Sequence, residues 1–143
     1  MAEPEVIRLL DIRDTPLSVD EVLAAVQDPR AGGTAVFIGA VRDVDGGKPV
    51  ARLGYTAHPE ALATLRAVAE SVCARWPVLA TAAVHRSGEL AVGDLAVVLA
   101  VACAHRGPAF EAARAFIDEL KETVPIWKEQ HFGDGTTEWV GAP

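Results

Sequence analysis

Two lysines near the C-terminal end of the sequence have the type and spacing that could support chemistry. Lys121 and Lys128 stand seven positions apart in DELKETVPIWKEQ, residues 118–130. Pro125 lacks an amide N–H and disfavours a helical residue before it, so a helix carrying Lys121 should end there. We expect the chain to fold back and bring Lys128 towards Lys121, with Trp127 as an apolar wall. A lysine in a partly dry, cationic pocket has a lowered pKa and can act as acid, base or nucleophile.

Plainer interpretations of both lysines remain open. Lys121 follows Asp118 by three positions and Arg114 by seven, which is the pattern of a solvated helix face with ion pairs. Lys128 could be an ordinary loop lysine beside Glu129. Spacing alone does not decide between these interpretations and a catalytic pair.

Basic residues also end three of the predicted strands. They are Arg42 in AVR, His85-Arg86 in VHR and His105-Arg106 in AHR. Ligands of helix-covered sheets tend to bind beyond strand ends, and arginine offers a fixed fork of donors for phosphate or carboxylate. His105 and Arg106 also precede a predicted helix that opens at Pro108, whose free amides favour an anion. Surface ion pairs are the alternative for each arginine, but three such ends in one small acidic protein favour an anion pocket.

Composition limits the class of protein. The 143 residues suit one domain, and a formal net charge of -7 with a pI of about 5.0 argues against a general nucleic-acid binder. Cys73 and Cys103 form no CxxC and have no zinc spacing, so we expect two buried, reduced thiols. There is no P-loop, nucleophile elbow or dinucleotide fingerprint. We predict no metal and no cofactor, and the lack of an apolar signal segment favours the cytoplasm.

Helices and strands should alternate along a single domain, residues 1–143. The predicted strands are 6–12, 34–42, 50–58, 79–86 and 94–106, with a hairpin or mobile loop at 43–49. The run 34–42 is nearly all apolar, which is typical of a central strand. Three helices should open after Ser18, at Pro59 and at Gly107-Pro108, and should stop near Pro29, Pro77 and Pro125. A two-layer α+β sandwich is the predicted architecture.

Capping and apolar spacing define these helices further. Ser18 and Glu21 have the spacing of a capping box, with Glu21 placed to reach back to the Ser18 amide. The second helix should bury Leu62, Leu65, Ala69, Val72 and Trp76, and the third Phe110, Ala113, Ile117, Leu120 and Val124.

Six segments carry a resemblance to a known family. They are FIGAVRD (37–43), RWP (75–77), VHRSGEL (84–90), VGD (92–94), AHRGPAFEAARAFIDELKETVPIWKE (104–129) and WV (139–140). In order and spacing they resemble the catalytic large subunit of molybdopterin synthase. The resemblance covers roughly residues 33–140, and the long segment ending in PIWKE is its most specific part. It implies an α/β hammerhead-like fold with a small added β subdomain.

The resemblance also implies an activity and partners. The expected enzyme converts cyclic pyranopterin monophosphate to molybdopterin, using sulfur from the C-terminal Gly-Gly thiocarboxylate of a small ubiquitin-like carrier subunit. A homodimer of this chain with one carrier at each end would form a heterotetramer.

Residue roles carry over by motif. Lys121 and Lys128 match the two catalytic lysines, Lys121 beside the thiocarboxylate carbon as acid/base or transient acyl acceptor. Lys128 would assist opening of the phosphate ring or hold the substrate. Arg42, His105 and Arg106 match residues that bind the pterin and its phosphate, and the sequence leaves open whether a second copy supplies some of them.

The chain departs from the family pattern at several positions. Thr56 and His58 stand where the family often has Glu and Tyr, and Gln130 stands where a glutamate commonly follows the second lysine by two. The stretch GDGTTE before Trp139 lacks a basic residue often found there.

Two other functions compete with the sulfurtransferase. A non-catalytic module could keep the fold and bind a phosphate or pterin, or serve as a scaffold, and an unrelated phosphate-ester enzyme is a weaker third. The presence of both lysines across a helix stop favours the enzyme, because a binding module would not need the second.

Overall fold

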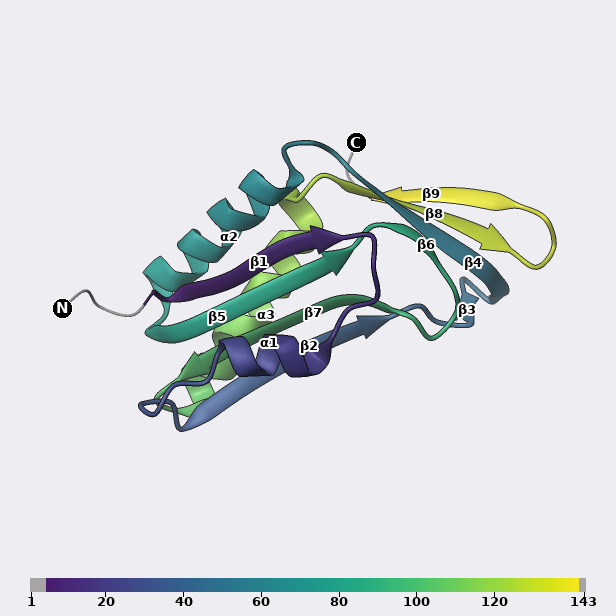
Figure 1. Cartoon of the computed structure of the whole chain (residues 1–143). Coiled ribbons are helices and arrows are strands. Elements are labelled where there is room, and N and C mark those ends of the chain that lie inside the picture. Colours follow the sequence, from purple (N-terminus) through teal and green to yellow (C-terminus); the bar gives the residue numbers. More distant parts are fainter. Residues whose placement is uncertain (1–4, 142–143) are drawn as a thin grey trace.

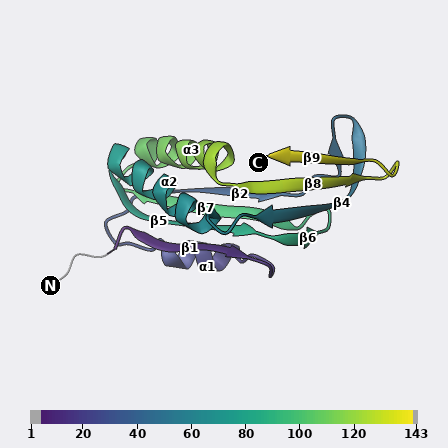
Figure 2. The same ribbon diagram turned by 90° about the horizontal axis from the view of Figure 1, so that it is seen from above.

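A mixed four-stranded sheet is the centre of the computed structural model, which describes residues 5–141 (Figure 1). Its strand order is β1 (Ile7–Arg13), β5 (Val78–Arg86), β7 (Leu95–Cys103) and β2 (Gly33–Ala40). Strands β1 and β5 pair in parallel, and the other two pairs are antiparallel. Helices α2 (Ala61–Arg75) and α3 (Arg106–Thr123) cover one face, and the short α1 (Val19–Ala25) covers the other (Figure 2).

A second sheet extends beyond one end of the first. It contains β3 (Val44–Asp45), β4 (Lys48–Ala57), β8 (Ile126–Phe132) and β9 (Thr137–Gly141), with β6 (Gly88–Leu90) paired to β4 (Figure 1). The predicted α+β class and the added β subdomain are therefore confirmed. To the predicted two layers the structure adds α1 on the opposite face of the main sheet.

The two central strands explain why the main sheet is covered on both faces. In β7, Val97, Leu99 and Val101 pack towards α2 and α3, while the alternate residues Val98 and Ala100 pack towards α1. Side chains of a strand alternate between faces, so a strand buried on both sides is a continuous apolar run.

Strand β2 is an edge strand, so the prediction of a central strand for residues 34–42 was wrong. Ala35 and Phe37 pack against the core beside α3, whereas Val36 and Ile38 are exposed. An apolar run looks the same in a buried strand and in an edge strand with an exposed apolar face. The sequence could not distinguish them.

Two helical stripes differ from prediction at single positions. In α2, Leu62 is 43% exposed, and Ala61 and Val68 are buried instead. In α3, Phe110 is 66% exposed and Phe116 is fully buried. The other predicted stripe residues lie in or against the core, and the alanine before each exposed residue, Ala61 or Ala109, is buried in its place.

The helix ends agree better with prediction. Ser18 Oγ accepts a hydrogen bond from the Glu21 amide at 3.2 Å, so Ser18 caps α1. The reciprocal half of the capping box was wrong, because the Glu21 carboxylate pairs with Arg13 of β1. Helix α3 ends at Thr123 before Pro125, as predicted.

The turn at residues 43–49 is the predicted hairpin. Gly46 and Gly47 join β3 to β4 with φ values of 58° and 79°, which favour glycine. No helix within residues 5–141 is long and apolar enough to cross a membrane.

The observed stripe of α2 predicts different costs for two leucines. Leu65→Ala removes a side chain that is 1% exposed and should lower the free energy of unfolding by about 2 to 5 kcal/mol. Leu62→Ala, three positions away, should cost less than about 1 kcal/mol because its side chain is partly solvated. Urea unfolding of both variants measures the difference. Equal costs would contradict the observed orientation of α2.

Candidate functional site

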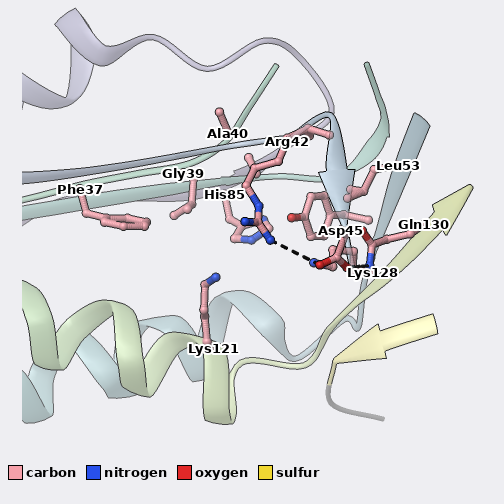
Figure 3. Close-up of a pocket in the computed structure, with 14 residues that line it drawn as sticks. Phe37, Gly39, Ala40, Arg42, Asp45, Leu53, His85, Lys121, Lys128 and Gln130 are labelled. Atoms are coloured by element: carbon pink, nitrogen blue, oxygen red, sulfur yellow. Dashed lines mark hydrogen bonds and ion pairs between the residues drawn. The ribbon is translucent and has the colours of Figure 1, made fainter. Parts of the chain in front are cut away.

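A cavity of about 320 Å³ lies where the two sheets meet, beside the C-terminal end of α3 (Figure 3). Its polar lining consists of Arg42, Asp45, Tyr55, His85, Lys121, Lys128 and Gln130. A cavity of this volume suits a small molecule. Three cationic side chains outnumber the one carboxylate in this lining, so the cavity favours an anionic ligand.

The break at Pro125 brings the two lysines to this cavity, as predicted. Lys121 lies in the last turn of α3 and points towards the main sheet, and Lys128 lies on β8 (Figure 3). Lys121 is largely exposed in the single chain, whereas Lys128 is half-buried. Trp127 does not line the cavity, contrary to expectation, because neighbouring side chains of a strand point to opposite faces.

An apolar compartment of about 190 Å³ adjoins the polar one. The two share Tyr55, His85, Lys121 and Lys128, and the apolar walls are Leu120, Val124, Ile126 and Val140. Both lysines therefore stand at the junction of a polar and an apolar space.

Opposing effects set the charge of Lys128. Burial is the largest and lowers the pKa of its ammonium group, and the positive charges of Lys121 and Arg42 lower it further. The carboxylate of Asp45 acts in the opposite direction and favours the charged form. The ammonium group is therefore easier to deprotonate than that of a free lysine.

A buried amide holds this carboxylate in place. Gln130, 2% exposed on β8, donates from Nε2 to Asp45 Oδ2 at 2.7 Å. Arg42 Nη2 lies 3.4 Å from the other carboxylate oxygen. The hydrogen bond from Gln130 lowers the pKa of Asp45, and the charges of Lys128 and Arg42 lower it further. The sequence indicated only turn chemistry at Asp45, and no signal pointed to this contact across 85 positions.

His105 and Arg106 do not reach this cavity within one chain. Arg106 opens α3 and Lys121 lies in its last turn, and the 18 residues of this helix span about 27 Å. His105 and Arg106 instead line a separate, open surface with Gly32 and Pro108. The predicted site thus falls into two parts, with Arg42, Lys121 and Lys128 at one end of α3.

The other departures from the family pattern lie outside the cavity. His58 accepts a hydrogen bond at Nδ1 from the Glu60 amide at 3.0 Å, and its ring meets that of Trp127 edge to face. Thr56 pairs with Trp127 across β4 and β8. Only Gln130 changes the cavity itself.

The two cysteines and the His, Cys, Asp and Glu side chains of residues 5–141 suggest no reactive thiol and no metal site. Cys73 and Cys103 are free, and burial raises the pKa of both. Among residues 5–141, no group of three or more His, Cys, Asp or Glu side chains is placed to hold a metal ion.

The fold and the cavity define an α+β protein with a cationic pocket that two lysines line and that suits a small anion. The family model described as MoaE protein matches residues 12–123. The chain belongs to the MoaE family.

Similar proteins agree with this assignment. The chain is 46% identical over 131 residues to molybdopterin synthase catalytic subunit 1 of Mycobacterium tuberculosis, covering 91% of this chain and 88% of the relative. The crystal structure of molybdopterin synthase from Staphylococcus aureus superposes with a TM-score of 0.85 and 32% identity, covering 92% of this chain and 96% of the other.

A third likeness concerns the fold alone. It is to a chain in a complex of subunits 1 and 2 of molybdopterin-converting factor from Helicobacter pylori, with a TM-score of 0.69 and 24% identity. The alignment covers 93% of this chain and 89% of the other.

The contact network predicts how Asp45 acts on Lys128. Asp45→Asn removes the negative charge that opposes the effect of burial, so the pKa of Lys128 should fall further. An NMR titration of the Lys128 side-chain methylene signals measures this pKa. Asp43→Asn, on the same hairpin but outside the cavity, is the matched control. An unchanged or higher pKa of Lys128 in Asp45→Asn would refute the electrostatic role of Asp45.

Proposed function

We propose that this chain is the catalytic subunit of a molybdopterin synthase. It transfers sulfur from the C-terminal thiocarboxylate of a small carrier subunit to cyclic pyranopterin monophosphate. The observation that carries the proposal is the meeting of Lys121, Lys128 and Arg42 at one cavity. The 46% identity to a molybdopterin synthase catalytic subunit supports it. We also propose that it works in the cytoplasm, where its free thiols stay reduced.

The two compartments suggest how the reactants are arranged. The phosphate and pterin would occupy the polar compartment, where Arg42 and Lys128 offer donors to anionic oxygens. The narrow carrier tail would enter the apolar compartment and present its thiocarboxylate at the junction, next to Lys121.

The positions of the two lysines suggest a different catalytic role for each. The thiocarboxylate sulfur attacks a substrate carbon. A C–S bond forms, the bond from that carbon to an oxygen of the cyclic phosphate breaks, and the tail remains as an acyl group on the sulfur. Lys121, at the junction, can stabilise negative charge that develops on the tail carbonyl. Lys128, beside Arg42, can hold the phosphate and the oxygen released when its ring opens.

A second copy of the chain would complete the site. Among residues 5–141, no strand pairs with the outer edge of β2, which exposes Val36 and Ile38, and edges of this kind readily pair with another chain. Phe110 extends the apolar surface onto α3, in a groove that also reaches Lys121. We propose that this face joins two copies about a twofold axis.

The geometry of β2 supports a contribution from the second copy to the site. At one end of the strand, Gly33 lies so close to Arg106 that a Cβ on Gly33 would stand 3.0 Å from the Arg106 Cα. At the other end, Ala40 leads to Arg42 and the cavity. An antiparallel arrangement of two β2 strands therefore carries His105 and Arg106 of one copy towards the cavity of the other.

Removal of either lysine should stop sulfur transfer. Lys121→Ala should abolish product formation, and Lys128→Ala should lower the rate by about 100-fold or more, since each removes a group at the reacting centre. Mass spectrometry of a reaction with thiocarboxylated carrier and cyclic pyranopterin monophosphate counts the sulfurs added.

An exposed lysine provides the control for these variants. Lys48→Ala changes a hairpin lysine that lies outside the cavity and pairs with Asp134, so it should keep the normal rate. Near-normal rates from both site variants would refute the roles of the lysines. Binding of substrate by the unmodified protein without any sulfur transfer would favour the binding module instead.

Mixing two inactive variants tests the shared site. Lys121→Ala and Arg106→Ala should each be inactive alone, yet a mixed dimer would contain one intact site. Random exchange of subunits makes about half of the dimers mixed, and each mixed dimer has one intact site of its two. About a quarter of all sites should therefore be restored. The measurement is the sulfur-transfer rate after the two proteins are mixed and equilibrated.

The interface itself supplies the control for this mixing. Ile38→Asp, introduced into both variants, places a charge on the proposed apolar face and should prevent the recovery. Absence of recovery in the original mixture, with subunit exchange verified by native mass spectrometry, would show that Arg106 of one copy does not serve the cavity of the other.

A further inference from the structure

His85 is a buried titratable side chain in the cavity to which nothing above gives a role. It lies near the end of β5, is 7% exposed, and lines both the polar and the apolar compartment (Figure 3). It therefore stands at the same junction as the two lysines.

Its hydrogen bonding determines which ring nitrogen carries the proton. His85 Nδ1 lies 2.7 Å from the carbonyl oxygen of Arg86. A carbonyl oxygen only accepts, so Nδ1 must carry the hydrogen and donate it. In the neutral ring, Nε2 then has a free lone pair, and within residues 5–141 it makes no hydrogen bond.

Packing keeps this ring neutral and in one orientation. The Tyr55 ring meets it edge to face, with the centroids 4.9 Å apart and the planes at 87°. Burial lowers the pKa of His85, the bond to the Arg86 carbonyl partly opposes this, and the charge of Lys121 lowers the pKa further. The neutral form therefore persists below pH 6.5.

The other polar groups of the cavity are poor proton acceptors. Lys121 from α3, Lys128 from β8 and Arg42 beyond β2 accept no proton in their charged forms. Burial raises the pKa of Tyr55, which keeps its hydroxyl protonated. The carboxylate of Asp45 is engaged by Gln130 and Arg42, and its lowered pKa makes it a weak base.

We infer that Nε2 of His85 is the general base that activates the water releasing the carrier tail. This role rests on the proposed function, in which sulfur attack leaves the tail as an acyl group on the new sulfur. A water oxygen bonds to the acyl carbon while its proton moves to Nε2. The acyl C–S bond then breaks, the proton passes from the imidazolium to the leaving sulfur, and the tail departs as a carboxylic acid that loses its own proton to solvent. No oxidant or reductant is needed.

The tautomer is tested on the chain alone, without any activity. Nitrogen-15 NMR should show His85 in the neutral form with hydrogen on Nδ1, and a pH titration should place its pKa below 6.5. Hydrogen on Nε2 would overturn the inference whatever the enzyme does, because that atom could then accept no proton.

The catalytic role is tested with His85→Gln, which keeps a polar group near Nε2 but cannot take up a proton. The variant should still form the covalent carrier–substrate adduct, and its release should slow by about 100-fold or more. Intact-mass spectrometry should therefore show the adduct accumulate. In the unmodified protein, release should fall as pH falls through the pKa of His85. This acid limb should be absent from the variant.

A second histidine provides the matched control. His131→Gln changes a ring on the face of β8 opposite Lys128, where it pairs with Glu129 at 3.1 Å, and should release the tail at the normal rate. Thermal unfolding of His85→Gln verifies that it folds.

The outcomes separate this inference from the proposed function. Normal release and an unchanged acid limb in a folded His85→Gln would overturn the role of His85 and leave the synthase intact. No adduct and no product from the unmodified protein would overturn both.

Discussion

Pro125 cannot donate the amide hydrogen that another turn of α3 would need, and its ring disfavours a helical conformation at Val124, which is extended. The helix therefore ends at Thr123, and the chain leaves in an extended conformation as β8. Helix α3 belongs to the layer that covers the main sheet, and β8 belongs to the second sheet. One local constraint thus places the two lysines on different parts of the fold, facing one space.

The cavity between α3 and β8 has an excess of positive charge. Gathering Arg42, Lys121 and Lys128 is unfavourable without an anion, and the protein compensates only in part through Asp45. The remaining positive charge suits the phosphate of the proposed substrate, and the acidic chain concentrates these cations at one place. The buried amide of Gln130 matters here because it holds Asp45 without neutralising it.

Local signals predicted much of the fold. Ser18 capping, the Gly46-Gly47 turn and the stop at Pro125 depend on a few neighbouring residues, and all are present in the structure. The meeting of Lys121 and Lys128 followed from the last of these.

Features that depend on distant parts of the chain were missed. The edge position of β2 depends on strand order, which an apolar run does not encode. The contact of Asp45 with Gln130 joins two strands far apart in sequence, and both residue types are common in turns and on surfaces. The family motif identified His105 and Arg106, but a motif carries no distance, and the length of α3 separates them from the lysines.

Side chains alternate along β8, so the number of residues between Pro125 and Lys128 decides which side chains face the cavity. Ile126, Lys128 and Gln130 share one face, and Trp127 and Glu129 share the other. Insertion of a single residue before Trp127 would exchange the two faces, putting an indole where the ammonium group stands and removing Gln130 from Asp45. A substitution in this segment changes one side chain of the cavity lining. A one-residue insertion would change all the side chains that β8 contributes to it.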